Sequence, residues 1–182
     1  MVKFLLISVL LMFLHSCSIG YWLPEGGLRP KNYNKTSFYK YRKNFKFNSL
    51  SSLDTTAIYV SVGFFDHNDE FIRYEQYYSE DSEQGGIKFD NTGKCSIISF
   101  KPEEQTSFDS RTGTMGFYKF KDFDKLKVYT YTATTGGHRF IEREFIIKGD
   151  SLIMKDHFTG KDYEVHLKSK LLKNRNYLPF DW

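Results

Sequence analysis

The chain has 182 residues, with 26 Lys and Arg against 22 Asp and Glu, which gives a formal charge of +4 at neutral pH. This length suits one domain with a sizeable core. A dedicated nucleic-acid surface would need a concentrated basic stripe, whereas the mild positive charge here is spread along the chain, so we expect no nucleic-acid partner. Aromatic residues make up 18%, mostly Tyr and Phe, which favours β-strands.

The first residues divide into the parts of a secretory signal. Lys3 supplies a positive charge, residues 4–14 form an apolar run, and His15 and Ser16 precede a cysteine at the expected cleavage point. An apolar run of this length is too short for a transmembrane helix, which needs roughly 20 residues. The sequence therefore predicts a signal peptide, with its helix, over residues 1–16.

The segment Leu14-His15-Ser16-Cys17 resembles the lipobox of bacterial lipoproteins. The resemblance implies that the Cys17 thiol receives a diacylglycerol, that cleavage exposes its amine, and that this amine is also acylated, commonly with palmitate. Two acyl chains anchor a protein stably, whereas one does so marginally. No Asp follows Cys17, which by the same resemblance favours the periplasmic face of the outer membrane. The alternative is an ordinary signal peptide with a chance cysteine.

Residues 17–54 show no sustained periodicity and contain Pro24, Pro30 and the pair Gly26-Gly27. We expect a lipidated N-terminus followed by a tether here, whose later part packs on the domain because it contains Phe45 and Phe47 among other aromatic residues. Basic patches at 40–46 and 168–175 are interleaved with apolar residues. They indicate solvated faces or, alternatively, contacts with anionic headgroups.

From Thr55 onward, short β-type runs alternate with turn residues, which is typical of an antiparallel sandwich or barrel. The sequence predicts an all-β domain over 55–169, an antiparallel meander of about eight or nine strands. The expected strands are 57–65, 71–78, 86–89, 94–100, 115–120, 126–132, 139–147, 151–154 and 163–167.

The order of these elements is similar to that of small bacterial lipoproteins with a lipocalin-like β-barrel. The residues that carry the resemblance are the lipobox, the turn Asp90-Asn91-Thr92-Gly93, and the runs Met115–Phe120 and Phe145–Leu152. The resemblance implies a barrel whose interior is either filled by side chains or encloses one small ligand.

Motifs for catalysis and metal binding are absent from the sequence: there is no Gly-x-Ser-x-Gly, no His-Glu-x-x-His and no phosphate loop. The histidines at 15, 67, 138, 157 and 166 have no metal-ligand spacing. With Cys17 acylated, Cys95 has no disulfide partner, and its place in a strand predicts a buried structural thiol. We therefore expect neither an enzyme nor a cofactor.

Two arginines interrupt otherwise apolar strand faces, Arg73 between Phe71 and Tyr77, and Arg143 between Ile141 and Phe145. If these faces point inward, both guanidinium groups could bind a carboxylate or phosphate head group. Alternatively the faces point outward, or Arg143 pairs with Glu142 or Glu144. A shift of one residue in register would reverse either assignment.

The C-terminal residues 170–182 end in an apolar tail, Asn176 to Trp182, which would pack on the barrel or bind a partner. Two functions fit the whole pattern. One is a membrane-anchored module that binds a small apolar or amphipathic ligand in its barrel. The other is a structural or assembly lipoprotein with a filled barrel that contacts another envelope protein.

Overall fold

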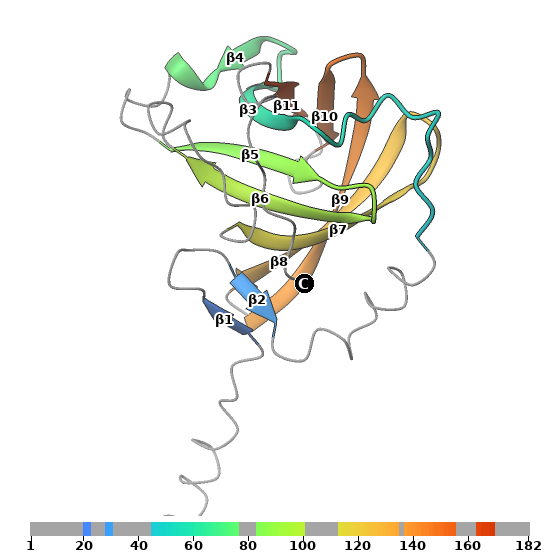
Figure 1. Cartoon of the computed structure of the whole chain (residues 1–182). Coiled ribbons are helices and arrows are strands. Elements are labelled where there is room, and N and C mark those ends of the chain that lie inside the picture. The colour runs from blue at the N-terminus through green and yellow to red at the C-terminus, as the bar shows by residue number, and fades with distance from the viewer. Residues whose placement is uncertain are drawn as a thin grey trace, which may run out of the picture.

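A closed antiparallel β-barrel forms the body of the protein (Figure 1). The computed structural model describes residues 20–22, 28–30, 45–76, 83–100, 113–134, 137–155 and 163–169. Eight strands form the barrel: β3 (Ile58–Phe65), β5 (Gln84–Phe89), β6 (Lys94–Phe100), β7 (Thr114–Phe120), β8 (Lys125–Thr134), β9 (Gly137–Lys148), β10 (Ser151–Lys155) and β11 (Tyr163–Lys168). Each pairs with the next, and β11 pairs with β3 to close the circle. The all-β prediction is confirmed, with a barrel rather than a sandwich, while the expected signal helix lies outside the described residues.

One expected strand is much shorter than its sequence pattern predicts. Residues 71–78 read as a full strand, but β4 (Phe71–Arg73) ends after three residues and the 3-10 helix η2 (Tyr74–Gln76) follows. The reason is that β3 pairs with β5 along residues 58–60, so β4 finds only residues 63–65 to pair with. β4 is therefore a short strand beside the barrel and not one of its eight members.

The inner wall is apolar and aromatic in the half of the barrel that contains the turns after β5, β7 and β9. Tyr59, Phe89 and Tyr118 are buried there, and their rings meet edge to face, with centroids 5.8 Å apart for the first pair and 5.0 Å for the second. Phe45, which precedes the barrel strands, packs against Tyr118 at 5.1 Å. Aromatic side chains therefore plug this half of the barrel.

The turn between β5 and β6 lies at the aromatic end of the barrel, and its conformation follows from its sequence. The Asp90 carboxylate accepts hydrogen bonds from the backbone amides of Thr92 and Lys94, at 2.8 and 2.9 Å. Gly93 then takes a positive φ of 88°, and a Cβ there would lie 2.5 Å from the Phe45 ring. The expected hairpin at Asp90–Gly93 is confirmed, and glycine is required both by the backbone and by the approach of Phe45.

A two-stranded hairpin lies on the outside of the barrel. β1 (Gly20–Trp22) pairs with β2 (Leu28–Pro30), and β2 contacts β7 and β8. Met115, Phe117 and Tyr129 form a buried apolar cluster on the outward side of β7 and β8. The hairpin belongs to the segment that we expected to be a tether, so part of that segment docks on the barrel wall (Figure 1).

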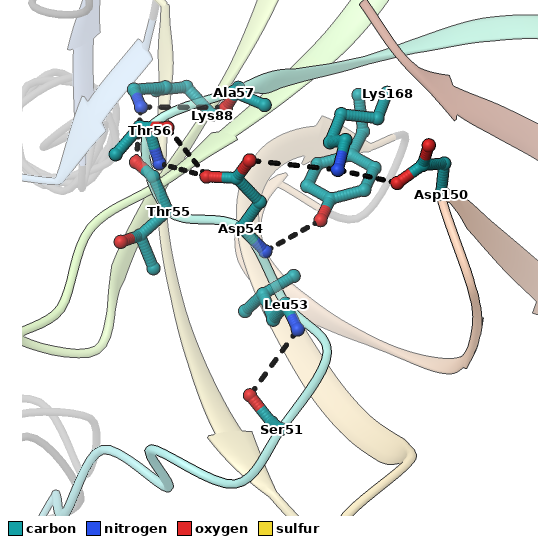
Figure 2. A network of polar contacts seen from close by, with 10 residues as sticks. Ser51, Leu53, Asp54, Thr55, Thr56, Ala57, Lys88, Asp150 and Lys168 are labelled. Atoms are coloured by element: carbon teal, nitrogen blue, oxygen red, sulfur yellow. Dashed lines mark hydrogen bonds and ion pairs between the residues drawn. The ribbon is translucent and has the colours of Figure 1, made fainter.

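A polar clasp joins the first and last strands of the barrel (Figure 2). The Tyr59 hydroxyl accepts a hydrogen bond from the Asp54 amide at 2.8 Å. Lys168 on β11 lies 3.7 Å from the Asp54 carboxylate and 2.5 Å from that of Asp150, in the turn between β9 and β10. The clasp therefore ties three separate segments together where β3 and β11 close the barrel.

Candidate binding sites on both faces of the barrel wall

The outer wall carries an apolar groove across β3, β4, β10 and β11. Residues paired across neighbouring strands share a face. Leu152 belongs to the inner core and pairs with His166, so Ile153, Val165 and Leu167 point outward. These three side chains line the groove, together with Val62, Phe65 and Phe71. Its volume is about 430 Å³, which is within the range of small-molecule sites.

Charged groups stand around this apolar floor. Arg73 on β4, Glu75 on η2 and Lys148 at the end of β9 line the groove, as does Ser151. Neither Arg73 nor Lys148 forms an ion pair with a described carboxylate. Among the described residues, the groove thus combines an apolar surface with one carboxylate and two cations that have no ion-pair partner, which leaves an excess of one positive charge.

The inner wall is polar in the half of the barrel away from the aromatic plug. Ser61 and His166 pair across β3 and β11, and both are buried. The Ser61 hydroxyl donates to Glu164 Oε1 at 2.5 Å, and His166 Nε2 lies 3.6 Å from the same oxygen. The Phe145 ring packs on the His166 imidazole, with centroids 5.7 Å apart.

His166 is buried, with only 5% of its surface exposed. Both ring nitrogens are buried, and neither has a hydrogen-bond partner among the residues that the structure describes. An unsatisfied buried polar group costs about 1 to 3 kcal/mol. Burial holds the pKa of His166 below its ordinary value of 6.5; Glu164 acts in the opposite direction, and Arg143 lowers the pKa further. The imidazole is therefore neutral at pH 7, with one unused donor and one unused acceptor.

Arg143 faces the barrel interior, as its predicted binding of a carboxylate or phosphate group requires. It pairs with Val128 of the inner core, and its Nη1 donates to Thr130 Oγ1 at 2.6 Å. The alternative pairing with Glu142 or Glu144 is wrong, because both carboxylates bind Lys127 on the outer wall. Arg143 forms no ion pair with a carboxylate in the described part of the chain.

The structure separates the two predicted arginines, with Arg73 in the outer groove and Arg143 on the inner wall. Cys17, the predicted lipidation site, lies outside the described residues, as does the tail 176–182. Cys95 is buried as expected, and burial raises the pKa of its thiol. The thiol is therefore protonated and unreactive.

Sequence reasoning missed the roles of Glu164 and His166. In the sequence, this histidine is one of five that are scattered along the chain. The available signal was the alternation Glu164-Val165-His166-Leu167, but an alternation of this kind ordinarily indicates that the polar side chains face solvent. Here the polar face points into the barrel and the apolar face points outward.

In the part of the chain that the structure describes, no helix is long and apolar enough to cross a membrane, and no group of three or more His, Cys, Asp or Glu residues is arranged for a metal ion. Comparison of this chain with protein families, with characterised proteins and with solved structures finds no match.

Proposed function

We propose that this protein is a lipid-anchored lipoprotein of the bacterial cell envelope that binds a small amphipathic ligand without catalysing a reaction on it. The observation that carries the binding role is the outer groove, with its apolar floor and with the cations Arg73 and Lys148, which form no ion pair within the described part of the chain. An apolar chain would bury surface in the floor, at about 25 cal/mol per Å² removed from water. An anionic head would complete the site beside the two cations.

The docked hairpin supports this arrangement at a membrane. Cys17 precedes β1 by three residues, a reach of about 10 Å. β2 contacts β7 and β8, which lie across the eight-stranded barrel from β11 and β3. Acyl chains on Cys17 would therefore hold the β7–β8 wall near the bilayer. The groove on the β3–β11 wall would face away from the bilayer and be open to ligands in the periplasm.

Ligand binding is tested by native mass spectrometry of the full chain released from a non-ionic detergent. The probes are dodecanoate, dodecanol and dodecyltrimethylammonium, which share an apolar chain and differ in head charge. We expect dodecanoate to give the strongest adduct. Replacing both cations (Arg73→Met with Lys148→Met) should weaken it at least tenfold, which corresponds to about 1.4 kcal/mol. Lys125→Met, at an exposed position on β8, is the matched control.

The floor is tested separately with Ile153→Asn, which places an amide among apolar side chains and should weaken dodecanoate and dodecanol alike. Equal adducts for all three probes, or unchanged adducts in the cation double variant, would contradict the proposed head-group preference. No adduct with any probe would contradict ligand binding in the groove.

The lipid anchor has its own test. Cys17→Ser should abolish lipid labelling and shift the protein from the membrane fraction to the soluble fraction, while Cys95→Ser should leave both unchanged. Retention of the lipid label in Cys17→Ser would refute the anchor without touching the binding proposal.

A structural or assembly role is the second candidate function, and it is favoured by the exposure of the groove. Phe71 and Leu167 are 40% and 43% exposed, which suits contact with another envelope protein. A photo-crosslinking residue in place of Phe71 decides between the two roles in intact membranes. A single protein adduct would support assembly, whereas crosslinking to lipid alone would support ligand binding.

A further inference from the structure

The polar half of the inner wall holds charged and polar groups that the outer groove does not use. Arg143 and Thr130 come from β9 and β8, Glu164 and His166 from β11, and Ser61 from β3. All lie on the inward side, as their pairing with core residues or with one another shows. This set is separated from Arg73 and Lys148 by the barrel wall itself.

Hydrogen bonding divides the set into satisfied and unsatisfied groups. The Glu164 carboxylate already accepts a hydrogen bond from Ser61. Arg143 donates only to Thr130 among the described residues, and a guanidinium has five N–H donors. His166 uses neither ring nitrogen. The unused capacity therefore consists mainly of donors. The two side chains share the inner wall around Phe145, which lies two positions from Arg143 on the same face of β9 and packs its ring on His166.

We infer that Arg143 and His166 form an internal oxyanion site, which binds a carboxylate or phosphate group and in which His166 takes up a proton as the anion enters. The fork of the guanidinium suits two oxygens of such a group. The imidazole N–H would donate to another, which satisfies the orphaned ring. This site is independent of the outer groove and of its proposed ligand.

Charge balance explains why His166 would take up a proton when an anion binds. With His166 neutral, the described inner wall around it carries Arg143 and Glu164, whose formal charges cancel. Lys168, two positions further along the same face of β11, is already paired with the carboxylates of Asp54 and Asp150. The inward neighbours of His166 on β3 and β10 are Ser61, Leu152 and Met154, which carry no charge. An added anion would leave one uncompensated negative charge in a low-dielectric interior, and protonation of His166 removes it.

The test uses ¹³C-labelled histidine in the full chain, kept in a non-ionic detergent and observed by NMR. His166→Gln identifies the signal of this residue among those of the other histidines. Sodium phosphate and sodium acetate are titrated in separately at constant pH, with sodium chloride at matched ionic strength as the screening control. Proton uptake is measured in parallel with a pH indicator.

We expect phosphate or acetate to move the His166 signal toward imidazolium in a saturable way, with proton uptake, and chloride to leave it in place. Preference for acetate would assign a carboxylate and preference for phosphate a phosphate group. Arg143→Met should weaken the response at least tenfold, whereas Arg73→Met, the matched arginine on the outer wall, should leave it unchanged.

A chloride response equal to that of phosphate and acetate, no response to either, or an unchanged response in Arg143→Met would overturn the site. Should Arg143→Met fail to fold, Thr130→Val serves instead. It removes the hydrogen-bond partner of Arg143 but keeps the charge, so the saturable response should persist within a few-fold, and its loss would equally overturn the assignment.

Discussion

Lys88 on β5 should make the stability of this protein rise with pH. Its ammonium donates to the backbone carbonyl oxygens of Thr55 and Ala57, in the turn before β3, and the residue is 6% exposed (Figure 2). Burial lowers the pKa of Lys88 from 10.5 to about 8, against the opposing charges of Asp54 and Asp90. The folded state therefore releases this proton at a lower pH than the unfolded state does.

The sign and size follow from proton linkage. Between the two pKa values the unfolded chain binds more protons, so the free energy of unfolding increases with pH. Because its pKa is lower in the folded state, Lys88 reduces the free energy of unfolding relative to a residue with no pKa shift. This reduction is about 3 kcal/mol at pH 7.5 and about 1 kcal/mol at pH 9.5. Stability should thus rise by about 2 kcal/mol over this interval through Lys88 alone.

The assay is urea unfolding followed by circular dichroism at pH 7.5 and 9.5, for the wild type and for Lys88→Met. The change in the free energy of unfolding between the two pH values should be about 2 kcal/mol more positive in the wild type than in Lys88→Met. The comparison is needed because burial raises the pKa of Cys95, so that ionisation of this thiol in the unfolded chain lowers the stability of both proteins over the same interval. Lys125→Met, at an exposed position, should show the same change as the wild type. The range stops below pH 10 because burial raises the pKa of Tyr118, which reverses the trend once unfolded tyrosines ionise. Equal pH dependence in the wild type and Lys88→Met would refute the reasoning.

Three further predictions concern the fold. Gly93→Ala should lower the free energy of unfolding in urea by about 3 kcal/mol, because the new Cβ adds a clash with Phe45 to the strain of a positive φ. Gly149→Ala has a φ of 56° but open space around its Cβ, so it should lower the free energy of unfolding by only about 1 kcal/mol. Equal losses in the two variants would contradict the clash with Phe45. The Cys95 thiol should resist maleimide in the native protein and react in urea, and equal rates would show that it is not buried. Lys168→Met should lower the free energy of unfolding by about 1 kcal/mol at low salt and by less at high salt, because salt screens the ion pairs of Lys168 with Asp54 and Asp150. A loss that does not depend on salt would contradict a stabilising role of these ion pairs.

Local sequence signals were sufficient for most strands of the barrel. The turn Asp90–Gly93 combines an aspartate that caps the turn with a glycine of positive φ, so the flanking strands could be placed within about two residues. Pairing between β11 and β3, which closes the barrel, joins residues about 100 positions apart. No local pattern encodes that contact, so the alternation of strands and turns leaves both a barrel and a sandwich open, and only the resemblance to lipocalin-like lipoproteins implies a barrel.

The face of each strand was harder to predict than its existence. On β3, residues 61 and 63 pair with consecutive residues of β11, so the register shifts beside Val62. Such an irregularity changes which side chains face inward, and nothing in the alternating apolar pattern marks it. Arg73 and Arg143 interrupt similar apolar patterns, yet one lines the outer groove and the other the barrel interior.

Both candidate sites have a common origin in the inverted polarity of β11. This strand has Glu164 and His166 on one face and Val165 and Leu167 on the other. Its burial would be most favourable with the apolar face toward the barrel interior and the polar face toward water. The structure does the opposite, and the inversion buries the unsatisfied His166 while it exposes the apolar floor of the groove. Places where local preference and fold disagree are where functional sites are expected. The two sites lie on opposite faces of this one strand. Replacing His166 and Glu164 by apolar residues should therefore abolish the response of the internal oxyanion site to phosphate and acetate, and leave ligand binding in the groove intact.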